Sequence, residues 1–345
     1  MHIAYLSDTW RWLGEHSGYD LLPQYVGQLD EAVRVTCAPP RLTSRINWLL
    51  DSQRIHDRRN WGYYRGSERI FLKEFSARPD CIGHILYLER HHEMVSRWSR
   101  APKTIVATLH NRPDPVEHPT FYEDLRRLHS AIVFYQRDRE FFEQFVESGK
   151  VVFINHGVDT DFFRPAVAPP QHARRLLYIG INGRDIAVLK EVIRRLEVAE
   201  PEVRFDFVVP KSHGVLSELR SHPKITWHRD LSDQALRSLY QASYLLLLPL
   251  KASGANNAVV EAMACGVAPV TTDIGGIRDY GGGSLYPVVA RSDGTAMVDL
   301  VRRYLRDPAW RNHVGSACRA FAEQNLAWPL IARKHLNFYR ELLSS

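Results

Sequence analysis

The sequence predicts an α/β protein built from two doubly wound, Rossmann-like domains. Short apolar runs rich in β-branched and aromatic residues alternate with helical stretches along most of the chain. Runs of this kind are typical of strands in a parallel sheet that is covered by helices on both faces. The alternation restarts after a proline-rich stretch, and 345 residues exceed one ordinary core. We therefore expect two such domains facing across a cleft.

Ten strands are expected, five in each half of the chain. In the first half they cover 3–6, 82–88, 104–109, 131–135 and 151–154. In the second half they cover 175–180, 204–209, 225–228, 244–249 and 268–271. Residues 161–170 hold three prolines just before the second series. Because proline restricts itself and its predecessor to extended conformations, this stretch is predicted to be a linker.

Composition limits the class of protein. Hydrophobic residues make up 45% and charged residues 24%, as in a globular protein. The longest apolar run, 244–250, is too short to cross a bilayer, and the first residues lack the basic start and apolar stretch of a signal peptide. The four cysteines lie far apart without a CxxC pair, which argues against a disulfide framework or a zinc site. A cytoplasmic protein is therefore expected.

The net charge of +6 favours an anionic partner, which is a phosphate-bearing substrate, an anionic membrane surface or nucleic acid. Residues 41–69 carry seven arginines, three acidic residues and two tryptophans. One interpretation is a solvated pair of helices. The other is an acceptor-side patch or a peripheral contact with an anionic membrane on its cytoplasmic face, since cationic heads and interfacial aromatics suit lipid headgroups. Nucleic acid is not expected, because no zinc-finger spacing, RNA-recognition sequence or basic helix is present.

Residues 248–266 carry the most specific chemical signal, a strand followed by a small polar loop and a helix. Asn256 or Asn257 is expected to cap the start of the helix, and Gly266 to end it in the left-handed conformation. The helix start, with its unpaired N–H groups and positive dipole end, suits a phosphate. Glu261 lies one turn inside, where its carboxylate can accept two hydrogen bonds from a ribose diol. The alternative is an ordinary structural unit in which Glu261 faces solvent.

This segment resembles the signature of the group-1 family of retaining GT-B glycosyltransferases, and is family 4-like. The matching residues are Glu261-Ala-Met-Ala-Cys-Gly266, the strand 267–272 and Asp273-Ile-Gly-Gly-Ile277. Three further segments resemble family elements in the same order: 155–163 its Asn-Gly-Val-Asp element, 231–240 the helix before the donor strand, and 328–339 its closing helix. The resemblance implies a GT-B fold with an N-terminal acceptor-side domain over 1–163, a C-terminal nucleotide-sugar donor domain over 172–328, and a helix over 329–345 that crosses back.

Carried over by position, the resemblance implies a donor site. Glu261 would hold the donor ribose. His110, at the end of a strand, would lie near the transferred sugar, where it can hydrogen-bond a hydroxyl or donate a backbone contact; the alternative is a loop residue without a ligand. The other residues expected to bind the donor are Gly18, Gly180, Arg184, Lys211, His228, Arg229, Gly254, Ala255, Asn256, Asn257 and Ala258.

Two departures from the family pattern affect this site. Ser253 stands where the family often has a second glutamate, so its hydroxyl is expected to make a weaker, uncharged contact with the sugar at the reacting centre. The family also places an arginine directly after the glycine that ends the first strand of the second domain, whereas here Gly180 is followed by Ile181. We expect Arg184, or else Lys211, to neutralise the diphosphate, because cationic side chains pair well with phosphate. Both are equally compatible with solvated surface cations.

The resemblance implies retaining transfer of a hexose from a UDP- or GDP-sugar, without a metal or other cofactor. The acceptor, whether glycan, lipid, protein or small molecule, stays open. The alternatives are a nucleotide-sugar epimerase of the same fold and a homologue with impaired donor binding. A Rossmann dehydrogenase is not expected, because residues 7–18 lack the GxGxxG that would follow the first strand.

Overall fold

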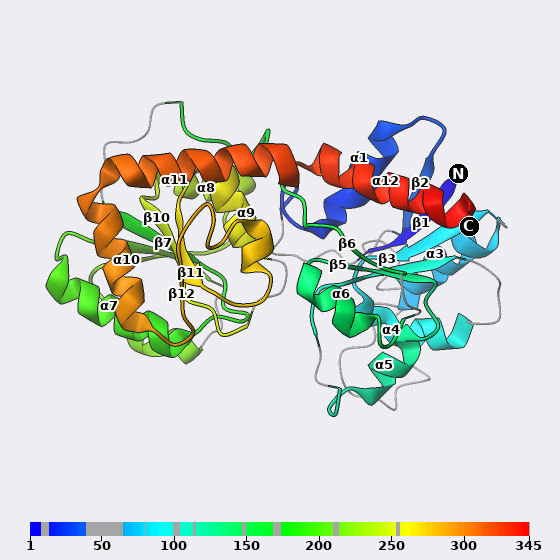
Figure 1. Ribbon diagram of the computed structural model, residues 1–345, viewed down its shortest axis with the longest axis horizontal. Helices are drawn as coiled ribbons and strands as arrows, with labels where there is room; N and C mark the ends of the chain where they lie inside the picture. The colour runs from blue at the N-terminus through cyan, green and yellow to red at the C-terminus, as the bar shows by residue number, and fades with distance from the viewer. Residues whose placement is uncertain are drawn as a thin grey trace. The chain divides into compact units, whose positions relative to one another are not determined.

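The computed structural model divides into two compact units (Figure 1). Unit 1 comprises Met1–Leu13, Tyr19–His156 and Pro329–Ser345, and unit 2 comprises Gly14–Gly18 and Gly157–Trp328. The structure describes residues 1–7, 14–38, 65–78, 80–98, 104–112, 115–146, 150–167, 174–209, 214–252 and 256–344. The division falls between His156 and Gly157. The boundaries expected from the sequence were instead residue 163 for the end of the first domain and residue 172 for the start of the second.

Unit 1 contains a parallel six-stranded sheet in the order β2-β1-β3-β4-β5-β6. Its strands are β1 (His2–Leu6), β2 (Arg34–Ala38), β3 (Cys81–Ile85), β4 (Ile105–Leu109), β5 (Ser130–Val133) and β6 (Val151–Phe153). Its helices are α1 (Leu22–Leu29), α3 (Arg65–Ser76), α4 (Leu88–Trp98), α5 (Pro119–Leu125), α6 (Gln136–Phe142) and most of α12 (Trp328–Ser344), with a 3-10 turn at Tyr19–Leu21. Helices α1 and α12 cover one face of this sheet, and α3 to α6 cover the other (Figure 1).

The sheet face toward α3 packs on an apolar core. Alternate residues of β1, Ala4 and Leu6, belong to this core together with Phe71 and Phe75 of α3. The two phenylalanines approach β3 so closely that a Cβ on Gly83 would lie 2.9 Å from the Phe71 ring. A glycine inside this strand therefore allows a helix carrying two aromatic side chains to pack on the sheet.

The opposite face carries a buried chain of hydrogen bonds. His335 Nδ1 lies 2.8 Å from the carbonyl oxygen of Ile331, which can only accept, so Nδ1 carries the proton. His335 Nε2 must then accept, and the Tyr19 hydroxyl at 2.6 Å donates to it. Thr108 Oγ1 donates to the Tyr19 oxygen at 3.1 Å. One backbone carbonyl thus fixes the tautomer of a histidine and the direction of two hydroxyls.

The chain of hydrogen bonds continues through a second histidine, His84, and the direction of each bond again follows from the one before. Thr108 Oγ1, its proton already donated, accepts from His84 Nε2 at 2.8 Å. His84 Nδ1 accepts from the Tyr339 hydroxyl at 2.6 Å, and Tyr339 accepts from Tyr5 at 3.2 Å. Desolvation lowers the pKa of His84 well below its usual value and that of His335 to about 4. Both rings are therefore neutral at physiological pH, and α12 is joined to β1, β3 and β4 by polar contacts inside an otherwise apolar layer.

Unit 2 contains a parallel six-stranded sheet in the order β12-β11-β10-β7-β8-β9. Its strands are β7 (Arg175–Ile179), β8 (Arg204–Val208), β9 (Ile225–His228), β10 (Leu245–Leu248), β11 (Pro269–Thr272) and β12 (Val288–Val289). Its helices are α7 (Ile186–Ala199), α8 (Asp233–Ala242), α9 (Asn257–Ala264), α10 (Gly294–Arg306) and α11 (Pro308–Phe321), with short turns at Gly214–Leu219, Ile277–Tyr280 and Ala322–Leu326. Helices α8, α9 and α11 cover one face, and α7 and α10 the other (Figure 1).

The strand order of unit 2 reverses between β7 and β10. From β7 the chain winds outward through β8 and β9, then returns to β10 and winds the other way through β11 and β12. Open α/β sheets bind ligands beyond the carboxyl ends of the strands at such a reversal. The loops that follow β7 and β10 are therefore the place where a ligand of unit 2 is expected.

The structure confirms the α/β fold class and all ten predicted strands, with ends that differ by a few residues. The prediction over 82–88 runs too far, because α4 already begins at Leu88. Two strands were missed. The edge strand β2 reads Arg-Val-Thr-Cys-Ala, too polar to stand out as an apolar run, and β12 has only two residues.

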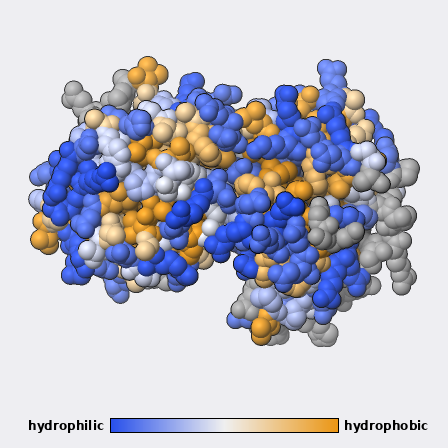
Figure 2. All heavy atoms as spheres, viewed as in Figure 1, coloured by the Kyte–Doolittle hydropathy of each residue, from blue (hydrophilic) through white to orange (hydrophobic). Residues whose placement is uncertain are grey.

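Hydrophilic residues are spread over the visible surface of each unit, with apolar patches between them (Figure 2). Within the described ranges, no helix is long and apolar enough to span a membrane. Most of the predicted arginine-rich patch at 41–69 lies outside the described residues, so the membrane contact expected there stays a prediction.

We predict that Thr108→Val lowers the unfolding free energy by about 1–3 kcal/mol, because it leaves the buried His84 N–H without its acceptor and removes the hydroxyl that donates to Tyr19. Urea denaturation checks this. Thr120→Val is the matched control, since Thr120 is exposed in the same unit. An equal, small effect of both substitutions would contradict the role given to the buried chain.

Candidate functional site

In unit 2, the turn after β7 is held against the turn after β10. The Asp185 N–H donates to the Pro249 carbonyl at 2.9 Å, and the N–H groups of Lys251 and Ala252 donate to the Gly183 carbonyl at 3.0 and 3.2 Å. Gly183 has a φ of +68°, and a Cβ on it would overlap the Ala252 carbonyl oxygen. The glycine is therefore needed for the two turns to meet at the reversal of strand order.

This turn carries a buried cation, Arg184, which is 9% exposed. Its Nε and Nη2 donate to the Ile179 carbonyl at 3.0 and 2.8 Å, and Nη1 donates to the Asn182 carbonyl at 3.0 Å. One N–H on each terminal nitrogen stays unused. Among the residues that the structure describes, no carboxylate pairs with it, and desolvation lowers the pKa of its guanidinium. A buried charge without a counter-ion is costly, so the arrangement favours an anionic ligand.

A buried carboxylate, Glu261, lies on α9 and is 5% exposed. Ser17 Oγ donates to its Oε1 at 2.7 Å, and Tyr240 Oη donates to its Oε2 at 2.8 Å. Desolvation raises the pKa of Glu261 to about 7, against the opposing effect of these two bonds. The alternative in which this side chain faces solvent is therefore wrong. Each oxygen keeps a second lone pair with which an ionised carboxylate can accept from a ligand hydroxyl.

Helix α9 begins at Asn257, and residues 253–255, just before its N-cap Asn256, are outside the described part of the chain. Asn256 occupies the N-cap position, but its side chain makes no capping hydrogen bond, contrary to the expectation. Its carbonyl accepts the Val259 N–H at 3.0 Å. At the other end, Gly266 has a φ of +72°, as predicted. The first-turn N–H groups of α9 therefore depend on something other than a capping side chain.

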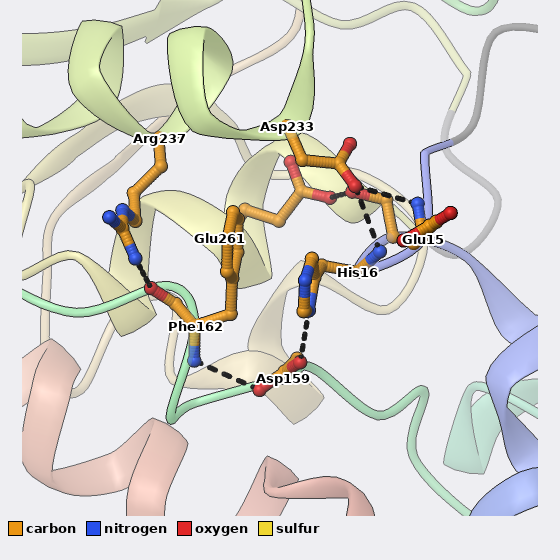
Figure 3. Close-up of polar contacts among 8 residues, drawn as sticks. Glu15, His16, Asp159, Phe162, Asp233, Arg237 and Glu261 are labelled. Carbon is orange, nitrogen blue, oxygen red and sulfur yellow. Dashed lines mark hydrogen bonds and ion pairs between the residues drawn. The ribbon is translucent and has the colours of Figure 1, made fainter.

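Residues 14–18, which belong to unit 2, contact the rest of that unit through three carboxylates (Figure 3). These are Asp159, Asp233 and Glu261. Asp233 Oδ2 accepts the backbone N–H groups of Glu15 at 2.6 Å and His16 at 3.2 Å. Gly14 lies so close to Asp233 that a Cβ would overlap its carboxylate. The segment is thus fixed by its backbone as well as by its side chains.

Two residues expected to bind the donor, His228 and Arg229, are placed differently from the rest. His228, at the end of β9, has its Nε2 2.7 Å from Asp206 Oδ1. Arg175 pairs with the same carboxylate through two bonds of 2.5 and 2.6 Å. Although burial raises it, these partners hold the pKa of Asp206 below its usual value. His228 is therefore anchored to the neighbouring strand through Nε2, while Arg229 is exposed.

His110 lies in unit 1, at the end of β4. Its backbone N–H and that of Asn111 donate to Glu89 Oε1 at 2.6 and 2.7 Å. Its Nε2 lies 2.7 Å from the Leu86 carbonyl, so Nε2 carries the proton and Nδ1 is left as an acceptor. The ring stacks on Tyr87 at 4.4 Å, and desolvation lowers the pKa of His110 to about 3. His110 was expected to donate its backbone N–H to the sugar or to hydrogen-bond a sugar hydroxyl. Its backbone N–H already donates to Glu89, so the remaining contact is a hydrogen bond from a sugar hydroxyl to Nδ1.

Apart from His110, His228 and Arg229, the predicted site residues divide into two sets. Gly18, Gly180, Arg184, Asn256, Asn257, Ala258 and Glu261 all lie in unit 2, on the loops after β1, β7 and β10 or on α9. Ser253, Gly254, Ala255 and Lys211 lie outside the described residues. Sequence reasoning missed Ser17, Tyr240 and Asp233. The last two are seven residues apart on the helix that it did predict, and this spacing puts them on one helical face.

Comparison with known proteins shows what the chain is similar to. Residues 173–307 match the family model described as glycosyl transferases, group 1. The alpha-maltose-1-phosphate synthase of Mycobacterium tuberculosis is 25% identical over 55% of this chain and 56% of its own length. The D-inositol 3-phosphate glycosyltransferase of Frankia alni is 25% identical over 56% of this chain and 54% of its own. The chain thus spans a little over half the length of these relatives.

Solved structures match nearly the whole chain at low identity. The sucrose-phosphate synthase of Thermosynechococcus elongatus has a TM-score of 0.76 and 15% identity, over 99% of both chains. HepE of Anabaena in complex with UDP has a TM-score of 0.74 and 13% identity, over 99% of this chain and 100% of that one. Residues 173–307 are thus similar to the group 1 glycosyl transferases, and the two α/β units of the chain have the GT-B fold.

Proposed function

We propose that the protein transfers a hexose from a UDP- or GDP-sugar to an acceptor, with retention at the anomeric carbon and without a metal. The observation that carries this proposal is the pair of buried, opposite charges in unit 2. Arg184 has unused N–H groups and no counter-ion among the described residues, and Glu261 has free lone pairs. A nucleoside diphosphate presents phosphates to the first and ribose hydroxyls to the second.

The relatives support this choice of ligand. The two curated relatives are named for the synthesis of a sugar phosphate and for glycosyl transfer to inositol phosphate. Structures of HepE hold UDP and UDP-glucose, and HepE shares the fold of this chain. Retention and independence from metal rest on the group-1 resemblance alone. The acceptor is unidentified, and the net charge of +6 favours an anionic one.

In the proposed reaction, the bond between the anomeric carbon and the phosphate oxygen breaks, and the diphosphate leaves with the electron pair. Arg184 and the first-turn N–H groups of α9 stabilise the charge that builds on the diphosphate. Glu261 holds the ribose, so binding energy from the nucleoside positions the reacting bond. The acceptor hydroxyl forms the new bond, and its proton passes to the leaving phosphate.

A panel of UDP, GDP, ADP and their glucose conjugates tests the donor site. We expect the nucleotides of one base to stabilise the folded protein by about 3 kcal/mol at a hundredfold excess over Kd, because they bind only the folded state. Glu261→Gln is expected to lose most of this stabilisation. Glu202→Gln, an exposed change in the same unit, is expected to keep it. Thermal unfolding measures both, and no stabilisation of the wild type at millimolar nucleotide would contradict the proposal. With the base identified, NMR of the anomeric proton of the product tests retention.

Arg184→Gln separates a phosphate contact from a structural role. We expect it to weaken binding of the nucleoside diphosphate about 10–100-fold, while the parent nucleoside binds as before. Arg306→Gln is the control, because Arg306 is exposed in the same unit. Calorimetric titrations with the diphosphate and with the nucleoside measure the two affinities. An equal loss for both ligands would mean that Arg184 only supports the turn after β7.

The raised pKa of Glu261 predicts a pH dependence of nucleoside binding. Below about pH 7 its carboxyl is mostly protonated and loses an acceptor, whereas above that pH it is ionised. Nucleoside affinity is therefore expected to rise with pH, by up to about tenfold per unit below the pKa, and to level off above it. Titrations of the nucleoside from pH 5.5 to 8.5 measure this. Glu261→Gln is expected to flatten the profile, and a wild-type affinity that stays constant over this range would count against the ribose contact.

A further inference from the structure

The side chain of His16 is held in one orientation in unit 2. Its Nδ1 lies 2.7 Å from Asp159 Oδ2, and the other carboxylate oxygen of Asp159 accepts the Phe162 N–H at 3.0 Å. The imidazole stacks on the Phe162 ring with centroids 3.7 Å apart and planes within 3° of parallel. Figure 3 shows the Phe162 ring between His16 and Arg237, whose Cζ lies 4.6 Å from the ring centroid. Both the tilt and the rotation of the imidazole are thereby fixed.

This orientation leaves one ring nitrogen available. Because Asp159 accepts at Nδ1, that nitrogen carries a proton, and Nε2 is the site that gains or loses one. Nε2 has no partner in the described part of the chain, and the side chain is 37% exposed. The backbone of residues 14–18 is already tied to Asp233, and Ser17 to Glu261. Attaching the segment therefore does not require the free nitrogen.

The charged groups around the ring come from four segments. They are Glu15 beside it, Asp159 before the turn at Phe162, Asp233 and Arg237 on α8, and Glu261 on α9. Most of them are carboxylates, so a phosphate entering these surroundings needs a positive neighbour. An imidazole that takes up a proton as the phosphate binds supplies one, and the Asp159 carboxylate lies against it at Nδ1.

The position of His16 next to Ser17 indicates which part of a bound donor it would contact. Its neighbour Ser17 donates to Glu261, the residue to which the proposed function assigns the ribose. In a nucleoside diphosphate, only C4′, C5′ and O5′ separate the ribose diol from the first phosphate. The residue next to the ribose contact is therefore within reach of the diphosphate.

We propose that His16 is a further ligand of the donor diphosphate, which it binds through a protonated Nε2 while Asp159 holds Nδ1. This inference rests on the proposed function and names one more residue of the same site. On binding, one proton passes from solvent to Nε2, and Nε2–H donates to a phosphate oxygen. The bond strengthens as the leaving diphosphate gains charge.

His16→Asn is the matched variant, because its amide N–H replaces the Nδ1 donor to Asp159 and nothing replaces Nε2. The probes are a sugar nucleotide and its nucleoside, UDP-glucose with uridine, or GDP-glucose with guanosine, according to the base that the panel identifies. The sugar nucleotide has no titrating terminal phosphate. Both probes contain the ribose, so the titration of Glu261 affects the binding of both. The ratio of sugar-nucleotide affinity to nucleoside affinity therefore isolates the phosphate contact.

At pH 6.5 we expect His16→Asn to weaken sugar-nucleotide binding about tenfold and to leave nucleoside binding within about twofold. The ratio of sugar-nucleotide affinity to nucleoside affinity is therefore expected to be about tenfold lower in the variant than in the wild type. Calorimetry in buffers of different ionisation enthalpy is expected to show extra proton uptake with the sugar nucleotide in the wild type alone.

Two results would overturn the role of His16 and leave the proposed function standing. One is an unchanged affinity ratio in the variant, and the other is an equal loss for nucleoside and sugar nucleotide, which would make His16 a support of the segment only. A wild-type protein that binds neither probe would refute the proposed function, and the role of His16 with it.

Discussion

The burial of the Glu261 carboxylate is the constraint on which the candidate site depends. A carboxylate removed from water is tolerable only when its oxygens accept hydrogen bonds, and here Ser17 and Tyr240 supply them. One hydroxyl comes from the segment after β1 and the other from α8, so a single side chain on α9 fixes the positions of two other elements. The cost of burying this group appears in its pKa, which desolvation raises to about 7.

Arg184 is a buried cation, and like the Glu261 carboxylate it is held by hydrogen bonds to neutral groups of the protein. Three of its five N–H groups donate to the carbonyls of Ile179 and Asn182, which are neutral, and its charge stays uncompensated among the described residues. Neither of the two buried charges pairs with the other, so neither cancels the charge of its counterpart. A ligand with phosphates at one end and hydroxyls close by satisfies both. A neutral ligand would leave Arg184 as it is, which is why a nucleoside diphosphate fits better than a nucleoside.

The sequence was sufficient for features that repeat or have a local cause. Buried apolar runs revealed ten strands, and the position of Gly266 revealed the end of α9. Glu261 was found because a dense run of neighbouring residues resembles a family signature. The partners of Glu261 were not found, because Ser17 lies 244 positions away, and only folding brings it to α9. Arg184 was a candidate for binding the diphosphate, a role that stays a prediction. Its burial was not foreseen, because the two carbonyls that hold it have no sequence signal.

The histidines show how the partner of one ring nitrogen decides what the other can do. In His335 and His110, a backbone carbonyl accepts from one nitrogen, and burial lowers the pKa to about 4 and about 3. A carbonyl offers no net charge to balance an imidazolium, so these rings are fixed as neutral hydrogen-bonding groups. His16 has the other arrangement, in which a carboxylate holds Nδ1 and the ring is partly exposed. A carboxylate at Nδ1 can balance the charge of an imidazolium, and this is a property that a ligand of a diphosphate needs.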